Sequence, residues 1–402
     1  MNYLWVTGMF RSGTTLLAKM LDAHPKIAFT SDPYRPYFND LRDMVARKNG
    51  LLKNNLPHMP LSDYFCDDEQ LKVMKFVQSA NLDMEIPKGH LEELKNLIAK
   101  RGMEFSPFVA QHVDELKGRN YCELFHSMMK LVAKYYGKGD EEIVGSKEVW
   151  CNEFTSVLLR SFNELKVINI IRDPRAVCAS RNIIGEKYPW LFLARQWRKL
   201  SIFSWLFTNY REFSKSLLVI RYEDLIQNPE EVSKKICSFI GVDFSYDMID
   251  GNKFREGDGS SWSQNSSYGT SKEISAKYSE KWREVLNEDQ IKLIEMLCCH
   301  EMKLFGYDPI NEGVDILSEK YVYDPLIVKQ EELAEWIKQY SDTRPIFNLI
   351  EMSKELVRNR LMHMDDNEIV QLKASNEIIE SLFIDRQYFN YARKSVFQEE
   401  KI

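Results

Sequence analysis

Residues 3–15 read Y-L-W-V-T-G-M-F-R-S-G-T-T. The run Tyr3–Thr7 is apolar and rich in β-forming side chains, which predicts one short buried strand. Gly8 ends this run, and from Thr14 apolar residues recur at helical spacing until Pro25 ends the helix. A strand, a glycine-bounded loop and a helix together point several backbone N–H groups at one place, which is suited to an anion. The predicted anion-binding residues are Arg11, Ser12, Gly13, Thr14 and Thr15.

The loop differs from the phosphate loop G-x-x-x-x-G-K-[ST] of nucleotide hydrolases in one informative position. Gly8 and Gly13 have the right spacing, but Thr14 stands where the lysine belongs, and the cation is Arg11 inside the loop. That lysine contacts the β- and γ-phosphates of a nucleotide that is bound with magnesium. Its absence favours an anionic ligand other than ATP·Mg. The alternative is an ordinary strand-turn-helix with incidental hydroxyl residues.

Composition restricts the class of protein. The 402 residues carry a net charge of −6, which disfavours general nucleic-acid binding. No apolar stretch approaches the roughly 18 residues of a membrane helix, so we expect no membrane span. The seven cysteines are odd in number and form no C-x-x-C pair, which favours a reducing compartment and disfavours structural zinc. Because the first residues already predict a strand, we expect no leader and a cytoplasmic protein.

Further strands alternate with helices along the chain. Besides the first strand, the predicted strands cover residues 24–30, 142–147, 166–171 and 216–220. Such alternation requires crossover connections between parallel strands. The fold class is therefore α/β, with a P-loop-like parallel sheet flanked by helices, a helical insertion and a helical C-terminal extension.

Two regions stand apart from this alternation. Residues from about 40 to 136 predict a mostly helical insertion that shapes an acceptor pocket. Before it, Pro33 and Pro36 are expected to hold the aromatic loop Tyr34–Phe38 extended, which hints at a pocket for a ring-bearing or sugar-like molecule. The aromatic-rich helix at 190–213 gives the same hint, although such stripes more often belong to a core.

We divide the chain into a domain at 1–310 and a helical C-terminal extension at 311–402. Within the extension, residues 311–326 are expected to be irregular and to precede three helical stretches at about 327–340, 345–361 and 366–398. These helices either dock on the core, form a homodimer or bind a partner.

A second anion site is predicted at Arg172 and Ser180. The strand at 166–171 ends directly on Arg172, and a helix begins after Asp173-Pro174, with proline at an early helical position. Ligands of open parallel sheets bind at the carboxyl ends of strands, where Arg11 and Arg172 both lie. Two anion sites on neighbouring strand ends suggest one ligand with two separated anionic groups.

These segments resemble those of the sulfotransferases. Residues 11–15 look like the loop that binds the 5′-phosphosulfate, and Arg172 with Ser180 looks like the 3′-phosphate site. The donor of that family is 3′-phosphoadenosine 5′-phosphosulfate (PAPS). The segment Leu217–Pro229 is also similar to a family segment, and this implies that Tyr222 lies near the adenine. The run from Arg11 to Pro25 most resembles tyrosylprotein sulfotransferases and related bacterial enzymes, and the resemblance covers roughly residues 1–40 and 140–310.

The resemblance also implies catalytic residues. Arg11 would stabilise the leaving group, and Lys147 matches a family lysine, although an ion pair with Glu148 is the alternative. The family's base is a glutamate shortly after the His-Pro that closes the first helix, and an ungapped alignment puts Asp32 there. Asp32 could instead cap the turn before Pro33. We expect His24 to be structural.

The resemblance implies a late segment that closes over PAPS, although the R-K-G signature of the family's cytosolic branch is absent from this sequence. Residues 254–267 are rich in glycine and serine, and Ser261 and Trp262 are the predicted contacts. A flexible linker is the alternative. No cluster of residues has metal-ligand spacing, so we expect no metal.

The sequence therefore favours a PAPS-dependent sulfotransferase that acts on a hydroxyl or amine of a small molecule, a sugar or another acceptor. The alternatives are a P-loop nucleotide kinase and a non-catalytic nucleotide-binding scaffold. The sequence does not identify the acceptor.

Overall fold

The computed structural model describes residues 2–51, 56, 68–87, 89–180, 188–262, 274–311, 333, 335–338, 345–371 and 375–399. Residues 312–326 of the predicted irregular segment and residues 263–267 of the predicted late loop lie outside these residues. The described residues fall into two compact units. The first contains residues 1–60, 73–172 and 207–279, and the second contains residues 61–72, 173–206 and 280–402. The predicted boundary near residue 310 stays a prediction, since the second unit includes residues on both sides of it.

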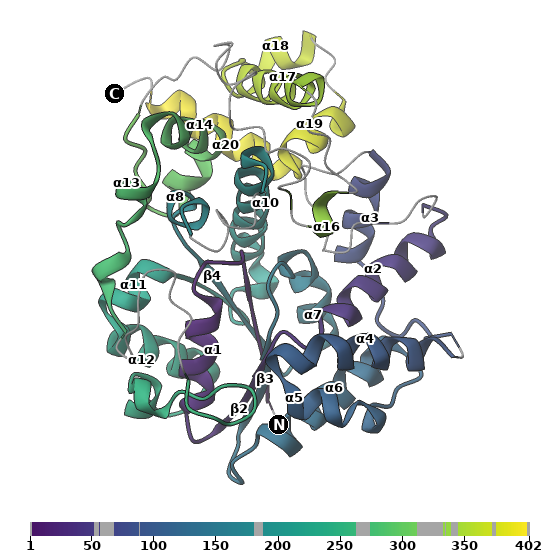
Figure 1. Cartoon of the computed structure of the whole chain (residues 1–402). Coiled ribbons are helices and arrows are strands. Elements are labelled where there is room, and N and C mark those ends of the chain that lie inside the picture. Colours follow the sequence, from purple (N-terminus) through teal and green to yellow (C-terminus); the bar gives the residue numbers. More distant parts are fainter. Residues whose placement is uncertain are drawn as a thin grey trace. The chain divides into compact units, whose positions relative to one another are not determined.

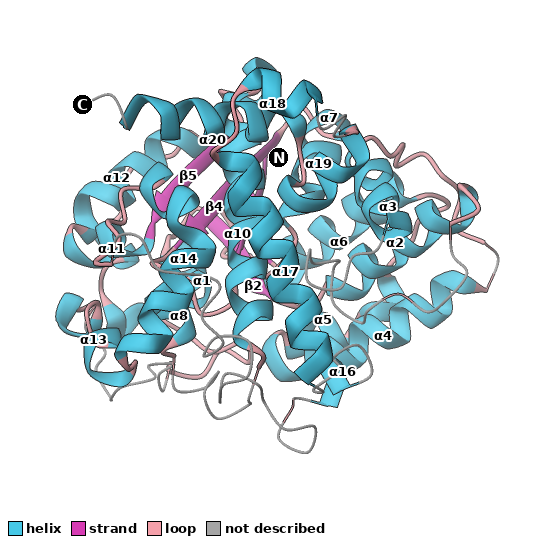
Figure 2. Cartoon of the chain, turned by 90° about the horizontal axis from the view of Figure 1, so that it is seen from above, coloured by secondary structure: helices cyan, strands magenta, loops and turns pink. Residues whose placement is uncertain are grey.

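The first unit is built on a parallel sheet, as the alternating pattern predicts. Its strands, magenta in Figure 2, are β1 (Asn2–Gly8), β2 (Ile27–Ser31), β3 (Ile143–Lys147), β4 (Leu165–Ile171) and β5 (Leu217–Arg221). All pairings are parallel and the strand order is β2-β3-β1-β4-β5. Each predicted strand therefore exists, with ends displaced by at most three residues.

Helices cover both faces of this sheet. Its first-unit helices are α1 (Thr14–Ala23), α2 (Arg35–Lys48), α4 (His90–Phe105), α5 (Pro107–Gln111), α6 (Tyr121–Tyr136), α7 (Thr155–Ser161), α11 (Tyr222–Gln227) and α12 (Pro229–Ile240). Side chains of a strand alternate between faces. Leu4 and Val6 pack in one cluster with α1 and α12, whereas Trp5 contacts the rings of Phe38 and Phe125 on the other face. In Figure 1, α1 and α6 lie on either side of the strands.

The prediction of an extended aromatic loop at 34–38 is wrong. Helix α2 begins at Arg35, with Pro36 in its first turn. Proline is tolerated there because the N–H groups of the first turn have no intrahelical acceptor. Tyr34, Tyr37 and Phe38 are fully buried. These aromatic residues therefore form core and not an acceptor pocket.

The second unit is helical in its described residues. Its elements are α8 (Pro174–Cys178), most of α10 (Trp190–Asn209), α13 (Trp282–Val285), α14 (Glu288–Leu304), α16 (Glu335–Lys338), α17 (Pro345–Met362), α18 (Asp366–Gln371), α19 (Asn376–Phe383) and α20 (Arg386–Glu399). Helix α3 (Asp68–Gln78) crosses the division between the units. The aromatic residues of α10 are mostly buried, among them Phe192, Trp197 and Phe203, so this stripe is also core.

The single helix predicted at 366–398 is divided into α18, α19 and α20. Ser375 accepts a hydrogen bond from the backbone N–H of Ile378, and Asp385 accepts one from that of Tyr388. Each side chain caps a new helix, and such caps compete with continuation of the preceding one. The break was visible in the sequence as two cap-forming residues inside the apolar pattern.

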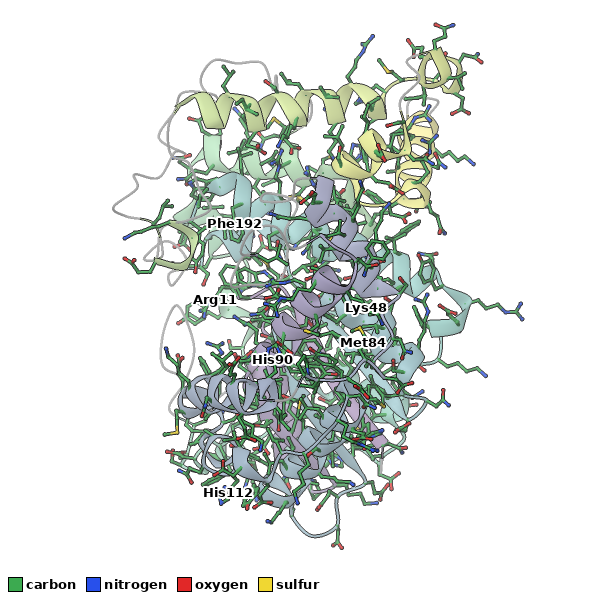
Figure 3. The ribbon with its side chains drawn as sticks, turned by 90° about the vertical axis from the view of Figure 1, so that its right-hand side faces the viewer. Arg11, Lys48, Met84, His90, His112 and Phe192 are labelled. Atoms are coloured by element: carbon green, nitrogen blue, oxygen red, sulfur yellow. The ribbon has the colours of Figure 1, made fainter. Side chains whose placement is uncertain are left out.

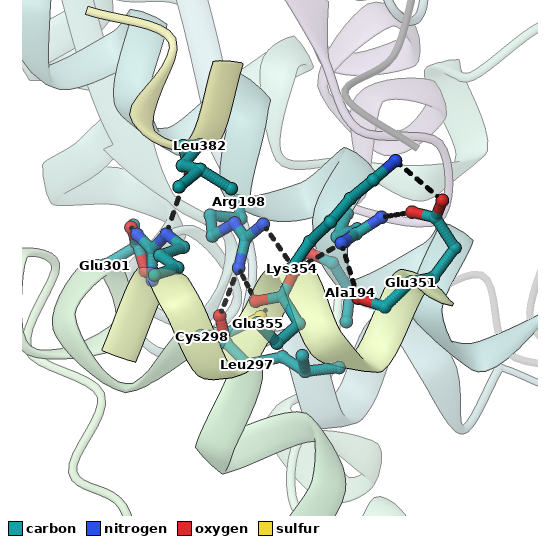
Figure 4. A network of polar contacts seen from close by, with 11 residues as sticks. Ala194, Arg198, Leu297, Cys298, Glu301, Glu351, Lys354, Glu355 and Leu382 are labelled. Carbon is teal, nitrogen blue, oxygen red and sulfur yellow. Dashed lines mark hydrogen bonds and ion pairs between the residues drawn. The ribbon is translucent and has the colours of Figure 1, made fainter. Parts of the chain in front are cut away.

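Buried ion pairs join the helices of the second unit, as Figure 4 shows. We call this the C-terminal cluster: Arg195, Arg198, Glu301, Glu351, Glu355 and Arg358. Arg198 Nη1 lies 2.7 Å from Glu355 Oε2, and Arg358 Nη2 lies 2.7 Å from Glu301 Oε1. These contacts tie α17 to α10 and to α14. Within the second unit, one side of α17 is thus packed against α10 and α14.

Candidate active site at the carboxyl edge of the sheet

Five strand ends define the site. Because all pairings are parallel, the carboxyl ends of the strands lie at one edge of the sheet. Asp32 follows β2, and Lys147 is the last residue of β3. The strand order puts both residues on one side of the loop after β1. Arg172 and Tyr222, which follow β4 and β5, lie on the other side. The predicted site residues of these strands therefore share one edge, with the loop between the two groups.

The loop after β1 is tightly curled. Arg11 has a φ of 66° and Gly13 a φ of 88°, both in the left-handed region. A Cβ atom at Gly13 would lie 2.1 Å from Cδ2 of Tyr222, and one at Gly8 would lie 2.4 Å from the carbonyl oxygen of Ile170. Both positions consequently require glycine. In Figure 3, Arg11 lies well away from His112, the residue that follows α5.

The loop presents donors suited to an anion. Helix α1 begins at Thr14 without a side-chain cap and without an acidic residue in its first turn. Its first N–H groups have no acceptor within the helix. The Ser12 hydroxyl is fully buried and has no hydrogen-bond partner among the described residues. A buried polar atom of this kind is expected to have a partner, and an anionic ligand in the loop would supply it. The residues present therefore fit the terminal phosphosulfate of PAPS.

The residues beyond β4 and β5 contact this loop directly. Arg172 donates a hydrogen bond of 2.9 Å from Nη1 to the carbonyl oxygen of Arg11. Its guanidinium lies 4.5 Å from the centre of the Tyr222 ring, which in turn packs against Gly13. The structure thus brings Arg11, Gly13, Arg172 and Tyr222 together, as a nucleotide site requires. Their individual roles stay predictions.

Ser180 belongs to the second unit, where it is buried directly after α8. The start of α8 is fixed by Arg175, which lies 2.7 Å from Asp173 and 2.6 Å from Glu295. All three side chains are buried. The predicted contact of Ser180 with the 3′-phosphate stays a prediction.

Asp32 and Lys147 form a buried ion pair. Asp32 has a φ of 57°, and its N–H donates to the carbonyl oxygen of Lys147 at 2.7 Å. Although burial alone would raise it, the pKa of Asp32 is lowered, because Lys147, Arg35 and Arg101 favour the ionised carboxylate. The described partner of Lys147 is therefore Asp32, and not Glu148 as in the alternative. The described side-chain contacts of Asp32 lead to β3 and its end, and not to the turn at Pro33.

His24 is structural, as expected. It is buried, its Nδ1 accepts the N–H of Lys26 at 3.1 Å, and its Nε2 lies 2.8 Å from the carbonyl oxygen of Asp243. The two contacts together specify a neutral ring whose Nε2 donates. Burial lowers the pKa of His24, which also favours the neutral form.

Three charged residues at this edge were not predicted as site residues. We call Asp32, Lys147, Glu148, Arg35 and Arg101 the edge cluster. Glu148 is fully buried and its Oε1 accepts the N–H of Tyr34 at 2.6 Å. Burial, and next the charge of Asp32, raise the pKa of Glu148 to about 8. Its place directly after Lys147 at a strand end was a usable signal, whereas nothing in the local pattern indicated Arg35 or Arg101.

Ser261 and Trp262 lie in a hairpin whose contacts reach the C-terminal half of α1. Arg255, paired with Ser261 in an isolated bridge, lies 3.0 Å from Asp22, and Lys19 contacts Glu256 at 3.2 Å. The Trp262 ring packs 5.5 Å from that of Phe254. The anion-binding loop precedes the opposite end of this helix. The described contacts therefore do not bring the hairpin to the loop, and its role in binding PAPS stays a prediction.

Two searches of the described residues concern other kinds of site. No group of three or more histidine, cysteine, aspartate or glutamate residues there is arranged to hold a metal ion. Among the helices that the structure describes, none has both the length and the apolar composition for crossing a membrane.

The chain is similar to several known proteins. A model of the sulfotransferase family matches residues 4–246. Carbohydrate sulfotransferase 1 of Danio rerio is 27% identical over 171 residues, covering 38% of this chain and 40% of that protein. Carbohydrate sulfotransferase 2 of Mus musculus is 31% identical over 111 residues, 27% of this chain and 20% of that one. The chain thus matches less than half the length of these relatives. The sulfotransferase domain of the Synechococcus PCC 7002 olefin synthase has a TM-score of 0.40 at 17% identity, covering 74% of this chain and 94% of that domain.

Proposed function

Because the chain belongs to the sulfotransferase family, we propose that it transfers a sulfuryl group from PAPS to a hydroxyl group of a sugar. The observation that carries this proposal is the shared sheet edge. It holds an anion-binding loop with a cation, Arg11, beside a buried carboxylate that is paired with Lys147. Membership of this family argues against the alternative of a P-loop nucleotide kinase.

The loop side of the edge binds the donor in this proposal. The N–H groups at the start of α1, with Ser12, Thr14 and Thr15, hold the 5′-phosphosulfate. Arg172 holds the 3′-phosphate, and the Tyr222 ring lies against the adenine. The contact of Arg172 with the carbonyl oxygen of Arg11 supports this assignment, because it links the two ends of the donor site.

The chemistry requires a cation and a base. As the new bond between the acceptor oxygen and sulfur forms and the bond from sulfur to the phosphate oxygen breaks, negative charge develops on the leaving phosphate. Arg11 and Lys147 stabilise that charge. Asp32 accepts the proton of the attacking hydroxyl. Its lowered pKa keeps Asp32 ionised at neutral pH, the form in which a carboxylate can act as a base.

The names of the relatives support a sugar acceptor. Those reported above are carbohydrate sulfotransferases, so we propose a sugar hydroxyl ahead of an amine. Labelled PAPS incubated with a panel of oligosaccharides and amino sugars tests this directly. Transfer to hydroxyl-bearing sugars is expected. Binding of PAPS without transfer to any member would favour the non-catalytic alternative.

A binding measurement tests the donor separately. Adenosine 3′,5′-bisphosphate, the desulfated product, should raise the melting temperature more than ATP·Mg does. Stabilisation by ATP·Mg alone would contradict the proposed donor.

Two further expectations are part of the proposal. Six of the seven cysteines are described, and none of these six forms a disulfide, which supports a reducing compartment such as the cytoplasm. We also propose that the C-terminal helices mediate a homodimer. Light scattering on the purified chain tests the dimer, and a monomer at all concentrations would contradict it.

A further inference from the structure

Part of the edge cluster lies outside the proposed binding site of the donor. The strand order β2-β3-β1 separates the end of β2 from the end of β1 by two strand spacings, roughly 10 Å. The residues assigned to the nucleotide follow β4 and β5, on the opposite side of β1. The side of the edge beyond β3 therefore lies where an acceptor would approach.

Arg101 brings a positive charge to this side from the helical insertion. It belongs to α4, which packs beside α2 (Figure 1). Its Nε donates a hydrogen bond of 3.2 Å to the carbonyl oxygen of Asp32, the proposed base. The guanidinium lies 4.7 Å from the centre of the Phe105 ring, and 29% of the side chain is exposed. Arg101 is thus held beside the base while part of its surface stays accessible.

The charge of Arg101 is poorly balanced within the described residues. Its nearest carboxylate is that of Glu104, 3.8 Å from Nη1, whose side chain is 68% exposed. A pair that is so exposed contributes little. The carboxylate of Asp32 is bound by Lys147. Glu148 adds no full negative charge at neutral pH, since its pKa is raised to about 8.

A second guanidinium is close by. Arg35, at the start of α2, is buried, and its pKa is lowered first by burial and next by the positive charge of Arg101. Two like charges in proximity disfavour each other, and an anion placed between or beside them would relieve this repulsion. The accessible one of the two is Arg101.

We propose that Arg101 binds an oxyanion of the acceptor, a carboxylate or an existing sulfate, on a sugar close to the hydroxyl that receives the sulfuryl group. This inference rests on the proposed function. A guanidinium matches the planar pair of oxygens in a carboxylate or sulfate, and its Nη groups remain for the ligand while Nε is bound to Asp32. The acceptor class is therefore an acidic sugar.

The test compares acceptors that differ only in charge. The probes are oligosaccharides of equal length that contain a uronic acid, a sulfated hexosamine or the corresponding neutral sugar. The variants are Arg101→Gln and Arg101→Lys, with Arg119→Gln as the control, because Arg119 lies next to α6 with its side chain 89% exposed. Melting temperatures of all proteins are measured first.

The wild type should prefer the acidic acceptors. In Arg101→Gln the KM for them should rise about 10–100-fold, the range for a lost charged hydrogen bond, with the KM for PAPS kept. Arg101→Lys should recover part of the loss. Arg119→Gln should behave as the wild type. Comparing the KM for the uronic acid with that for the sulfated hexosamine shows whether Arg101 binds a carboxylate or a sulfate.

Two outcomes would overturn the inference and are distinguishable from each other. Efficient transfer to neutral sugars, with a selectivity that Arg101→Gln leaves unchanged, rejects the role of Arg101 and keeps the proposed function. Transfer to no member of the panel rejects both. If Arg101→Gln does not fold, the ionic-strength dependence of the wild-type KM decides, because screening should weaken only acidic acceptors.

Discussion

The edge cluster and the C-terminal cluster are both buried groups of arginine and carboxylate residues, yet their carboxylates differ. In the C-terminal cluster, Arg198 and Arg195 hold the pKa of Glu355 below its usual value, although burial would raise it. In the edge cluster, the pKa of Glu148 is raised to about 8, and two guanidiniums lie close enough to disfavour each other. A carboxylate that two arginines keep ionised, as Glu355 is, is typical of a structural role, whereas a carboxylate with a raised pKa beside like charges is typical of a site that receives a ligand.

The largest expected effect concerns Arg11, in the anion-binding loop at the same sheet edge as the edge cluster. Arg11→Ala should reduce transfer about 10³–10⁵-fold, by analogy with cations that act on transferred phosphoryl groups, while the fold survives. The side chain is only partly buried, so its loss leaves no cavity in the core. Single-turnover rates with labelled PAPS and circular dichroism measure the two properties. Activity that remains near that of Arg119→Ala would remove Arg11 from the mechanism.

Asp32→Asn tests the base. Turnover should fall about 10²–10⁴-fold, the usual range for a lost general base, with the affinity for adenosine 3′,5′-bisphosphate kept. The substitution also leaves Lys147 buried without its partner, which costs about 3–5 kcal/mol of folding free energy. The double variant Asp32→Asn/Lys147→Met should recover stability and not activity. If it recovers both, neither Asp32 nor Lys147 takes part in catalysis and the pair is structural.

For the C-terminal cluster we expect a substitution to reduce stability and to leave the activity of the folded protein unchanged. Glu355→Gln leaves Arg195 and Arg198 with a weaker partner and should cost about 3–5 kcal/mol of unfolding free energy. Urea unfolding measures this. The kcat per folded molecule should stay within a factor of two. A large loss of kcat in a protein that remains folded would show that this cluster is not purely structural.

The last effect concerns pH, and at any one pH step it is smaller than the losses above. A carboxyl group whose pKa is about 8 in the folded protein and near 4.5 in the unfolded chain binds a proton more tightly when folded. Its contribution to stability is therefore present below pH 4.5 and decreases between pH 4.5 and 8, by up to about 1.4 kcal/mol per pH unit. Glu148→Gln should abolish this decline in a series of urea titrations. Asp32, whose pKa is lowered, contributes stability that is lost only at acidic pH, so it cannot mimic the effect.

Much of the fold follows from local patterns. The β-branched runs at 166–171 and 216–220 predict strands because a strand buried on both faces must be apolar throughout. The glycines at 8 and 13 indicate the loop since close contacts with Ile170 and Tyr222 leave no room for a Cβ atom. These features are encoded within about ten residues, so a single sequence is enough to recognise them.

The rest of the site depends on contacts between distant residues. Arg101 meets Asp32 across 69 positions of sequence, and the pairing of Lys147 with Asp32 spans 115. No periodicity or motif at either residue indicates its partner. The error at 34–38 has a different cause: Pro36 fits the first turn of a helix as well as an extended loop, and burial of Tyr37 and Phe38 decides between them.

The strand order has a consequence for how such a protein can change over time. Since the donor contacts follow β1, β4 and β5, while Arg101 reaches the edge from the helical insertion, substitutions in α4 would leave donor use untouched. Acceptor preference could then drift along a lineage at little cost to the reaction itself. The same separation offers a practical route to new specificities, in which a library restricted to the exposed positions of α4 near Arg101 is screened against a fixed PAPS supply.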